Sequence, residues 1–146
     1  MRTDNRLPRV LHILLHLDEI DAPVTSDRMG EMFGMDPSLV RRTMGGLRKH
    51  GLVASIKGHG GGWHLQRPTT EISLMDVYTA LGSPNVFAIG VPEPSSPCLL
   101  EHAASKATQT ALSTARSVFE QELRSVSVSD LAQDAEFLKA PHGLQK

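Results

Sequence analysis

The sequence has one cysteine, Cys98, among its 146 residues. A lone cysteine excludes an intrachain disulfide framework, and together with six methionines it is typical of a reducing compartment. No apolar run approaches the roughly 20 residues that a membrane-spanning helix needs, and the N-terminus lacks the hydrophobic core of a signal peptide. We therefore expect a cytoplasmic protein without a membrane partner.

Aromatic residues make up only 4% of the chain, so the core must be built from aliphatic side chains, methionine and alanine. The net charge is close to zero, at −1, but it is unevenly distributed. Residues 1–67 hold ten Lys/Arg and seven Asp/Glu, whereas residues 68–146 hold five and nine, which gives +3 and −4. The first part is therefore suited to an anionic partner and the second part is not.

The sequence also lacks the patterns of common catalytic sites. It has no Ser-His-Asp or Cys-His-Asn arrangement, no paired carboxylates and no nucleotide-binding fingerprint, so we expect neither an enzyme nor a bound cofactor. His12 and His16 stand four residues apart on a predicted helix, a spacing found in metal sites. Because no Cys, Asp or Glu is arranged with them, we interpret the pair as two exposed histidines and expect no metal.

One segment carries charge of a single sign. Residues 41–67 include six Lys/Arg and no Asp or Glu, which favours contact with a polyanion. The same segment predicts a helix that leads into a hairpin with a glycine-rich tip at residues 58–62. A helix followed by a glycine-tipped hairpin is the layout of a winged helix-turn-helix, so the sequence predicts a DNA-binding protein.

Periodicity and capping residues predict three helices before the hairpin. Apolar residues repeat at helical spacing over residues 8–18. Thr25 suits the N-cap of a second helix that ends at Gly34, and Asp36 with Pro37 suits the start of a third. On the third helix the residues that would face the core are Val40, Met44 and Leu47.

The remaining elements predict a helical appendage. Strands over residues 53–57 and 62–66 precede a short helix over residues 74–81, and a long helix starts at Ser96-Pro97 and ends near Arg124. A stripe of mostly small residues on the long helix permits close approach of a second helix. We favour a dimer interface over packing on its own domain. The stripe consists of Leu100, Ala103, Ala104, Ala107, Ala111, Ala115 and Val118.

The expected fold class is mainly α with a small β-hairpin wing, a winged helix-turn-helix joined to a long C-terminal dimerisation helix. Residues 1–82 would form the DNA-binding domain and residues 83–97 a Pro-rich linker. The dimerisation helix and a short following helix would occupy residues 98–134, and residues 135–146 would form a disordered tail.

Base readout and phosphate neutralisation are separate tasks in DNA binding. Residues near the N-terminus of a recognition helix enter the major groove, and arginine matches the O6 and N7 acceptors of guanine. The expected base-reading residues are Ser38, Arg41 and Arg42. The residues that suit phosphate contacts are Arg48, Lys49 and Lys57.

The hairpin tip is poor in side chains, which suits insertion into a minor groove by His59 and Gly60. The tip lacks the G-x-x-x-x-G-K-[ST] pattern and lies within a hairpin, so we reject a nucleotide-binding loop. Trp63 would instead anchor the hairpin to the core.

Cys98 is expected near the second position of the long helix. There the partial positive charge of a helix N-terminus lowers the pKa of a thiol, and His102, one turn on, adds to this when protonated. If two such helices pair, their thiols would lie near each other. The two interpretations are a redox-sensing thiol and a small buried residue without chemistry.

Three ordered motifs resemble the Rrf2 family of bacterial transcriptional regulators, over roughly residues 6–130. LRKHGLV at residues 47–53 is similar to the family's LRKxGLV, KGHGGGW at 57–63 to its RGxGGGY wing, and EISLMDV at 71–77 to its EITLxDV. The resemblance implies a homodimeric winged-helix repressor, or sometimes an activator, bound to a pseudo-palindromic operator on double-stranded DNA. It also implies recognition by the helix that begins near Ser38, minor-groove contacts by the wing and dimerisation through the long helix.

The chain departs from the family in one respect. Well-studied members hold an iron–sulfur cluster through three cysteines near the start of the dimer helix, and only Cys98 is present here. Other members resemble cluster-free regulators, some of which sense oxidants through a cysteine in this region. We therefore expect a homodimeric repressor with a redox switch at Cys98. The alternatives are a winged-helix module that binds a partner enzyme, a small-molecule-responsive regulator without thiol chemistry, and a metal sensor.

Overall fold

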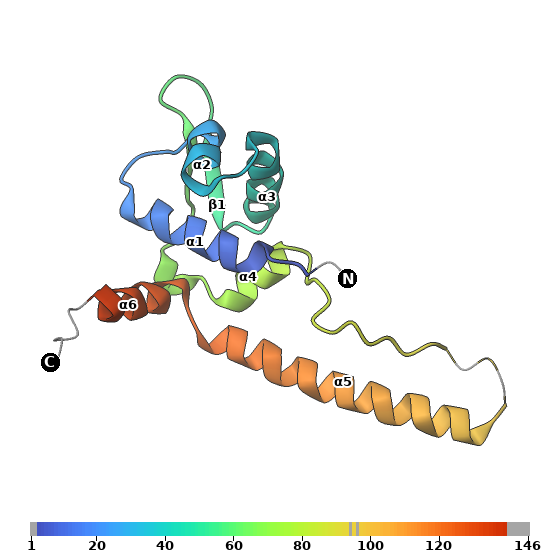
Figure 1. The fold of residues 1–146 in the computed structure, drawn as a ribbon. Helices are drawn as coiled ribbons and strands as arrows, with labels where there is room; N and C mark the ends of the chain where they lie inside the picture. The colour runs from blue at the N-terminus through green and yellow to red at the C-terminus, as the bar shows by residue number, and fades with distance from the viewer. Residues whose placement is uncertain (1–2, 94, 96, 140–146) are drawn as a thin grey trace, which may run out of the picture.

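The computed structural model describes residues 3–93, 95 and 97–139. Figure 1 shows a body of short helices that carries a hairpin, and a long helix that projects from this body. The described part is mostly helical with one two-stranded antiparallel sheet, which confirms the expected fold class. In chain order the elements are α1 (Arg6–Glu19), α2 (Ser26–Phe33), α3 (Pro37–Lys49), β1 (Val53–Ile56), β2 (Gly62–Leu65), η1 (Thr69–Glu71), α4 (Leu74–Ala80), α5 (Leu99–Ser125) and α6 (Val128–Lys139).

Local capping defines the helix-turn-helix formed by α2 and α3. Thr25 caps α2 by accepting a backbone N–H bond at 3.2 Å, and Gly34 ends the helix in the left-handed region at φ +61°. Asp36 caps α3 by accepting the backbone N–H of Ser38 at 2.8 Å. The predicted boundaries of this turn are therefore confirmed.

The core is aliphatic and lies where α1, α3, α4 and the hairpin meet. The three residues of α3 predicted to face the core, Val40, Met44 and Leu47, are each 0% exposed. Burying one such side chain fully contributes about 1.5–3 kcal/mol relative to leaving it in water. The buried residues that α1 adds to the core are Val10, Ile13, Leu14 and Leu17.

The hairpin is tied to the body by a third extended segment. Val24, just before α2, exchanges two backbone hydrogen bonds with Trp63 of β2, at 2.9 and 2.8 Å. Trp63 is 8% exposed, and its indole N–H donates to Ser26 Oγ at 2.9 Å. The predicted anchoring of the hairpin by Trp63 is confirmed, and the bridge to Val24 is an additional link between the hairpin and the start of α2.

The C-terminal helix returns to the body. The backbone N–H of Leu74 donates to Val126 at 2.9 Å, and that of Val128 donates to Ile72 at 2.8 Å. Val128 is fully buried in the same core as α1 and α3. α6 continues to Lys139, past residue 134 where we expected order to end, and residues 140–146 of the expected tail lie outside the described residues.

α5 projects from the body and leaves most of its apolar stripe exposed (Figure 1). Leu100 is 81% exposed and Val118 57%, whereas the end of the helix packs on the body through Leu123 and through Phe119 against the ring of Tyr78. The chain between α4 and α5 forms neither helix nor strand over its described residues. No helix among the described residues is long and apolar enough to cross a bilayer.

The start of α5 differs from the prediction. The helix begins at Leu99, so Cys98 is its N-cap residue and not its second helical residue. Ser96, where we expected the helix to start, lies outside the described residues. The extended backbone of Cys98, at ψ 116°, explains why the helix starts one residue after it.

Candidate nucleic-acid interface

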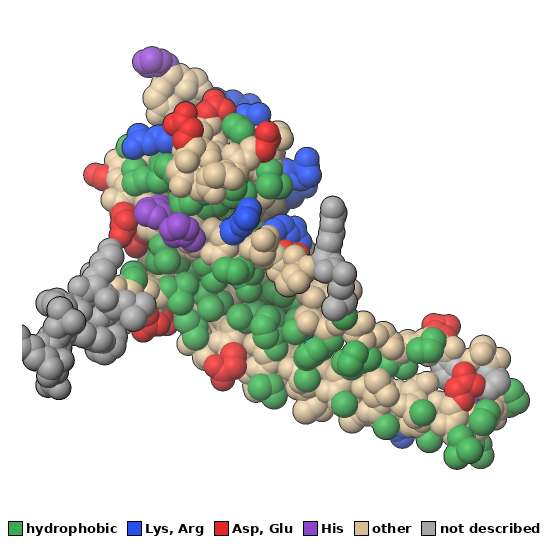
Figure 2. Space-filling view, viewed as in Figure 1, with side chains coloured by type: hydrophobic (Ala, Val, Ile, Leu, Met, Phe, Trp, Pro, Cys, Tyr) green, Lys and Arg blue, Asp and Glu red, His purple; other side chains and the backbone are tan. Residues whose placement is uncertain are grey.

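The outer face of α3 presents basic side chains to solvent. Arg41, Arg42 and Lys49 are exposed, and no acidic side chain of the described part of the chain lies within ion-pairing distance of them. Figure 2 shows Lys and Arg side chains on the side of the body that α3 occupies, whereas apolar side chains gather on its underside and along α5. Because one face of α3 is buried in the core, the basic side chains on its opposite face point to solvent.

Ser38 is held in place by the cap of α3. Its backbone N–H donates to Asp36 Oδ1 at 2.8 Å, and its hydroxyl donates to the same oxygen. Both hydrogen bonds lower the pKa of Asp36 and favour its charged carboxylate. The bond from the Ser38 hydroxyl has the larger effect and the bond from its backbone N–H the smaller. In this arrangement the Ser38 hydroxyl directs its lone pairs outward. A lone pair there can accept from the amino group of adenine or cytosine, and because the hydroxyl is exposed it can also rotate to donate.

Arg48 differs from the other basic residues because it bridges α3 and the hairpin. Its Nη1 donates to Ser55 Oγ of β1 at 3.4 Å, and its guanidinium carbon lies 5.9 Å from the centre of the Trp63 ring. This geometry is a weak hydrogen bond combined with a cation–π contact. Arg48 remains exposed, so it can also reach a phosphate while it fixes the hairpin relative to α3.

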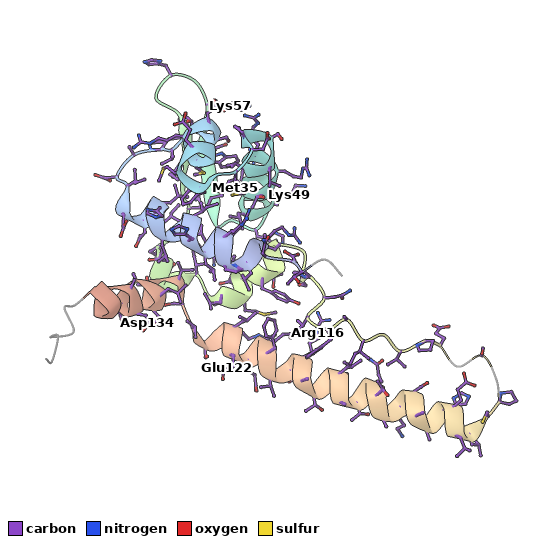
Figure 3. The ribbon with its side chains drawn as sticks, in the orientation of Figure 1. Met35, Lys49, Lys57, Arg116, Glu122 and Asp134 are labelled. Atoms are coloured by element: carbon purple, nitrogen blue, oxygen red, sulfur yellow. The ribbon has the colours of Figure 1, made fainter. Side chains whose placement is uncertain are left out.

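The hairpin tip exposes few side chains. Lys57, His59 and Gly60 are all exposed, and Figure 3 shows Lys57 and Lys49 on the body, remote from Arg116 on α5. The tip needs glycine: Gly60 has φ +75°, and a Cβ on Gly61 would lie 2.1 Å from the carbonyl oxygen of the residue at the end of β1. A narrow tip of this kind matches the width of a minor groove.

The histidine pair on α1 is more ordered than two independent exposed side chains. The Nε2 atoms of His12 and His16 lie 3.0 Å apart, and both rings contact Phe33, with centroids at 5.1 and 5.5 Å. His12 is exposed, but His16 is half-buried, which corrects our interpretation. Within the described part of the chain no three His, Cys, Asp or Glu side chains form a group that could hold a metal ion.

Cys98 is exposed at the N-terminus of α5. Hydrogen bonds from two backbone N–H groups lower the pKa of its thiol. The larger effect comes from Glu101 and the smaller from Leu100. These donors are the unsatisfied amides of the first helical turn, so the physical cause is the predicted one although the position differs by two residues along the helix.

Sequence reasoning missed two residues that support the interface without forming it. Val24 ties the hairpin to the start of α2, and Ser55 accepts from Arg48. A β-branched residue directly before a helix cap is a signal for extended backbone at Val24. Nothing local distinguishes Ser55, because its role depends on a partner seven residues away.

A helix-turn-helix with a basic outer face, followed by a glycine-tipped hairpin, defines the winged helix-turn-helix class. The model of the Rrf2 family, described as iron-dependent transcriptional regulators, matches residues 3–134. The chain therefore belongs to the Rrf2 family. Members of this family are transcriptional regulators and not enzymes.

Individual proteins are similar over parts of the chain. IscR of Serratia proteamaculans (strain 568) is 38% identical over 72 residues, which are 49% of this chain and 43% of IscR. YwgB of Bacillus subtilis (strain 168) is 30% identical over 83 residues, which are 56% of this chain and 53% of YwgB. The chain thus spans about half the length of the curated relatives it matches.

Solved structures share the fold over nearly the whole chain. T. potens IscR superimposes with a TM-score of 0.71 at 22% identity, covering 98% of this chain and 94% of that one. CymR of B. subtilis gives a TM-score of 0.66 at 21% identity, covering 91% and 97%. At these identities the likeness shows the fold alone.

The donor set of this chain does not match the iron that the family description implies. Cys98 is the only thiol in the sequence, and the described residues hold no group of three metal-ligating side chains. A cysteine-ligated iron–sulfur cluster within one subunit needs several thiolates. We therefore derive no role for iron here.

The close approach at the wing tip predicts that Gly61→Ala lowers the free energy of unfolding by about 1–3 kcal/mol, because the added methyl group must displace a backbone carbonyl. Urea unfolding followed by Trp63 fluorescence measures the change. His59→Ala, at the exposed tip, is the matched control and should stay within about 0.5 kcal/mol of wild type. Equal stability of the two variants would contradict the close approach.

Proposed function

We propose that this protein is a sequence-specific DNA-binding repressor that acts as a homodimer. The observation that carries the proposal is the outer face of α3, where exposed Arg41, Arg42 and Lys49 lie beside a glycine-tipped hairpin without an acidic partner. A helix of this kind enters a major groove while the hairpin reaches the adjacent minor groove. The family membership supports the same function.

Base reading falls to the first turns of α3. Arg41 and Arg42 can each donate two hydrogen bonds to one guanine, which discriminates against other bases by about 1–3 kcal/mol per good pair. Ser38 can accept from an amino group while its hydroxyl donates to Asp36. These three side chains give the helix both donor and acceptor functions, so different base pairs can be distinguished.

Phosphate contacts fall to the residues around these base readers. Lys49 and Lys57 are exposed point charges, and Arg48 is exposed while held over Trp63. Neutralising phosphates releases counterions, so binding that uses these residues falls steeply as salt rises. His59 and Gly60 contribute at the minor groove.

Dimerisation through α5 would cover the exposed stripe. The helix is 27 residues long, which corresponds to about 40 Å. The apolar side chains at its start are largely exposed to solvent, Leu99 by 82% and Leu100 by 81%. Alanines along the stripe allow a second helix to approach closely. A two-fold dimer places two recognition helices on one duplex, and its symmetry matches a pseudo-palindromic operator.

Cys98 is the proposed signal input. Its thiol is exposed and its lowered pKa increases the thiolate fraction at neutral pH, which is the form that reacts with peroxide. One related fold, CymR of Staphylococcus aureus, has been solved in an oxidised form. In a dimer joined through α5, oxidation of the two Cys98 thiols by peroxide would form a disulfide and two water molecules.

DNA binding predicts a specific response to two arginine substitutions. Arg41→Ala with Arg42→Ala should weaken binding to a duplex from the protein's own upstream promoter region by at least about 100-fold, because two bidentate contacts are lost. Fluorescence anisotropy at several salt concentrations measures affinity and salt dependence together. The control, Arg116→Ala with Arg124→Ala, removes the same charge from α5 and should bind like wild type. Weak wild-type binding with little salt dependence would instead favour a partner protein over DNA.

The dimer interface predicts that Ala111→Glu converts the protein to a monomer, because a carboxylate on the stripe would be buried without a partner. Sedimentation velocity measures the change in mass. Ser117→Glu adds the same charge at a position about 120° away around the helix axis, at 100° per residue, and should leave the dimer intact. A wild-type monomer, or an unchanged dimer in the Ala111→Glu variant, would exclude this interface.

The lowered pKa predicts that Cys98 is alkylated by iodoacetamide with a midpoint at lower pH than an ordinary cysteine. A thiol with a lower pKa is already deprotonated at a pH where the ordinary thiol is still protonated. The reference is the Cys98→Ser, Ser117→Cys double variant. It places the thiol well along the length of α5, away from the free backbone amides of the first turn. If DNA binding by wild-type protein is unaffected by mild peroxide, the switch is excluded while the repressor stands.

A further inference from the structure

The middle of α3 contains two glycines, Gly45 and Gly46, each of which costs about 1 kcal/mol relative to alanine inside a helix. Packing accounts for Gly46, because a Cβ there would lie 3.3 Å from the carbonyl oxygen of Ala80 at the end of α4. Packing does not account for Gly45. A Cβ at this position would meet no atom within 4 Å, and its backbone is not in the left-handed region.

Gly45 lies on the outer face of α3, between two pairs of basic residues. At about 100° per residue it points away from the buried side of the helix, in line with Arg42 and Lys49. Residues three and four positions apart are neighbours on a helix surface. The four exposed basic residues around Gly45 are therefore Arg41, Arg42, Arg48 and Lys49.

The arrangement forms a patch of bare helix backbone surrounded by four cations. Gly45 itself is partly exposed, and no side chain of the described residues comes within 4 Å of the position that a Cβ would occupy. Such a patch admits an anionic group more closely than a surface with a Cβ, and Coulombic attraction grows as the separation falls. The first turns of a recognition helix enter the groove, whereas Gly45 is nine residues into α3, where the helix passes the edge of the duplex.

We propose that Gly45 is the point at which α3 makes its closest approach to the sugar–phosphate backbone of DNA. The missing side chain lets one phosphate lie against the helix, within reach of the arginines and lysine on both sides. This inference rests on the proposed DNA binding and adds a positioning residue that has no hydrogen-bonding group of its own. The cost of glycine in the helix is offset by tighter contact with DNA.

The test replaces Gly45 with alanine and with leucine, which are both good helix formers, so folding is retained. Thermal unfolding should show Gly45→Ala to be at least as stable as wild type. Binding is measured on two duplexes, the upstream promoter fragment and a random sequence of equal length. We expect about a tenfold loss for alanine and a larger loss for leucine, similar on both duplexes, with a shallower salt dependence because a phosphate contact is lost.

Gly46→Ala is the matched control, because it adds the same methyl group one residue further on, toward α4. It should leave the DNA affinity of the folded protein unchanged. Wild-type affinity in both Gly45 variants would overturn the inference, and so would a loss confined to the promoter fragment, which would indicate contact with a base. If wild-type protein binds neither duplex, the proposed function fails first, which is a distinct result.

Discussion

The rotation of α3 about its own axis determines most of what this protein can do. Val40, Met44 and Leu47 are fully buried, and together they leave α3 one orientation on the body. A rotation that exposed them would cost about 1.5–3 kcal/mol for each residue. The same orientation turns Arg42 and Lys49 outward, so the basic face follows directly from the apolar one. A function that needs charge in a fixed place is thus secured by packing and not by ion pairs.

The hairpin depends on this orientation through a short chain of contacts. Arg48 of α3 lies over Trp63 and donates to Ser55, so the helix and both strands are held together. Trp63 in turn pairs with Val24 and donates to Ser26, which extends the contact to the start of α2. Each contact is individually weak, with net contributions on the order of 1 kcal/mol. Their geometry nevertheless fixes the spacing between the two elements proposed to enter adjacent grooves.

Local signals allowed much of this to be predicted from sequence. Thr25, Gly34 and Asp36 act through hydrogen bonds and backbone angles within a few residues, so the helix-turn-helix boundaries were predicted closely. The pairing of Val24 with Trp63 and the return of α6 to the core join residues far apart in the chain, which periodicity cannot show. The His12–His16 contact also depends on tertiary structure, because Phe33 holds both rings. The base and phosphate contacts themselves remain predictions.

The shape of the molecule limits how the proposed signal at Cys98 could act on DNA. The start of α5 lies at the far end of the projecting helix, remote from α3 and the hairpin (Figure 1). Oxidation there is too far from these elements to change a DNA contact directly, and α5 is one continuous helix of 27 residues. In the proposed homodimer, a bond between two thiols would instead change the angle between the paired helices. Because the half-sites of an operator have fixed spacing, a small change in that angle would move both recognition helices out of register together.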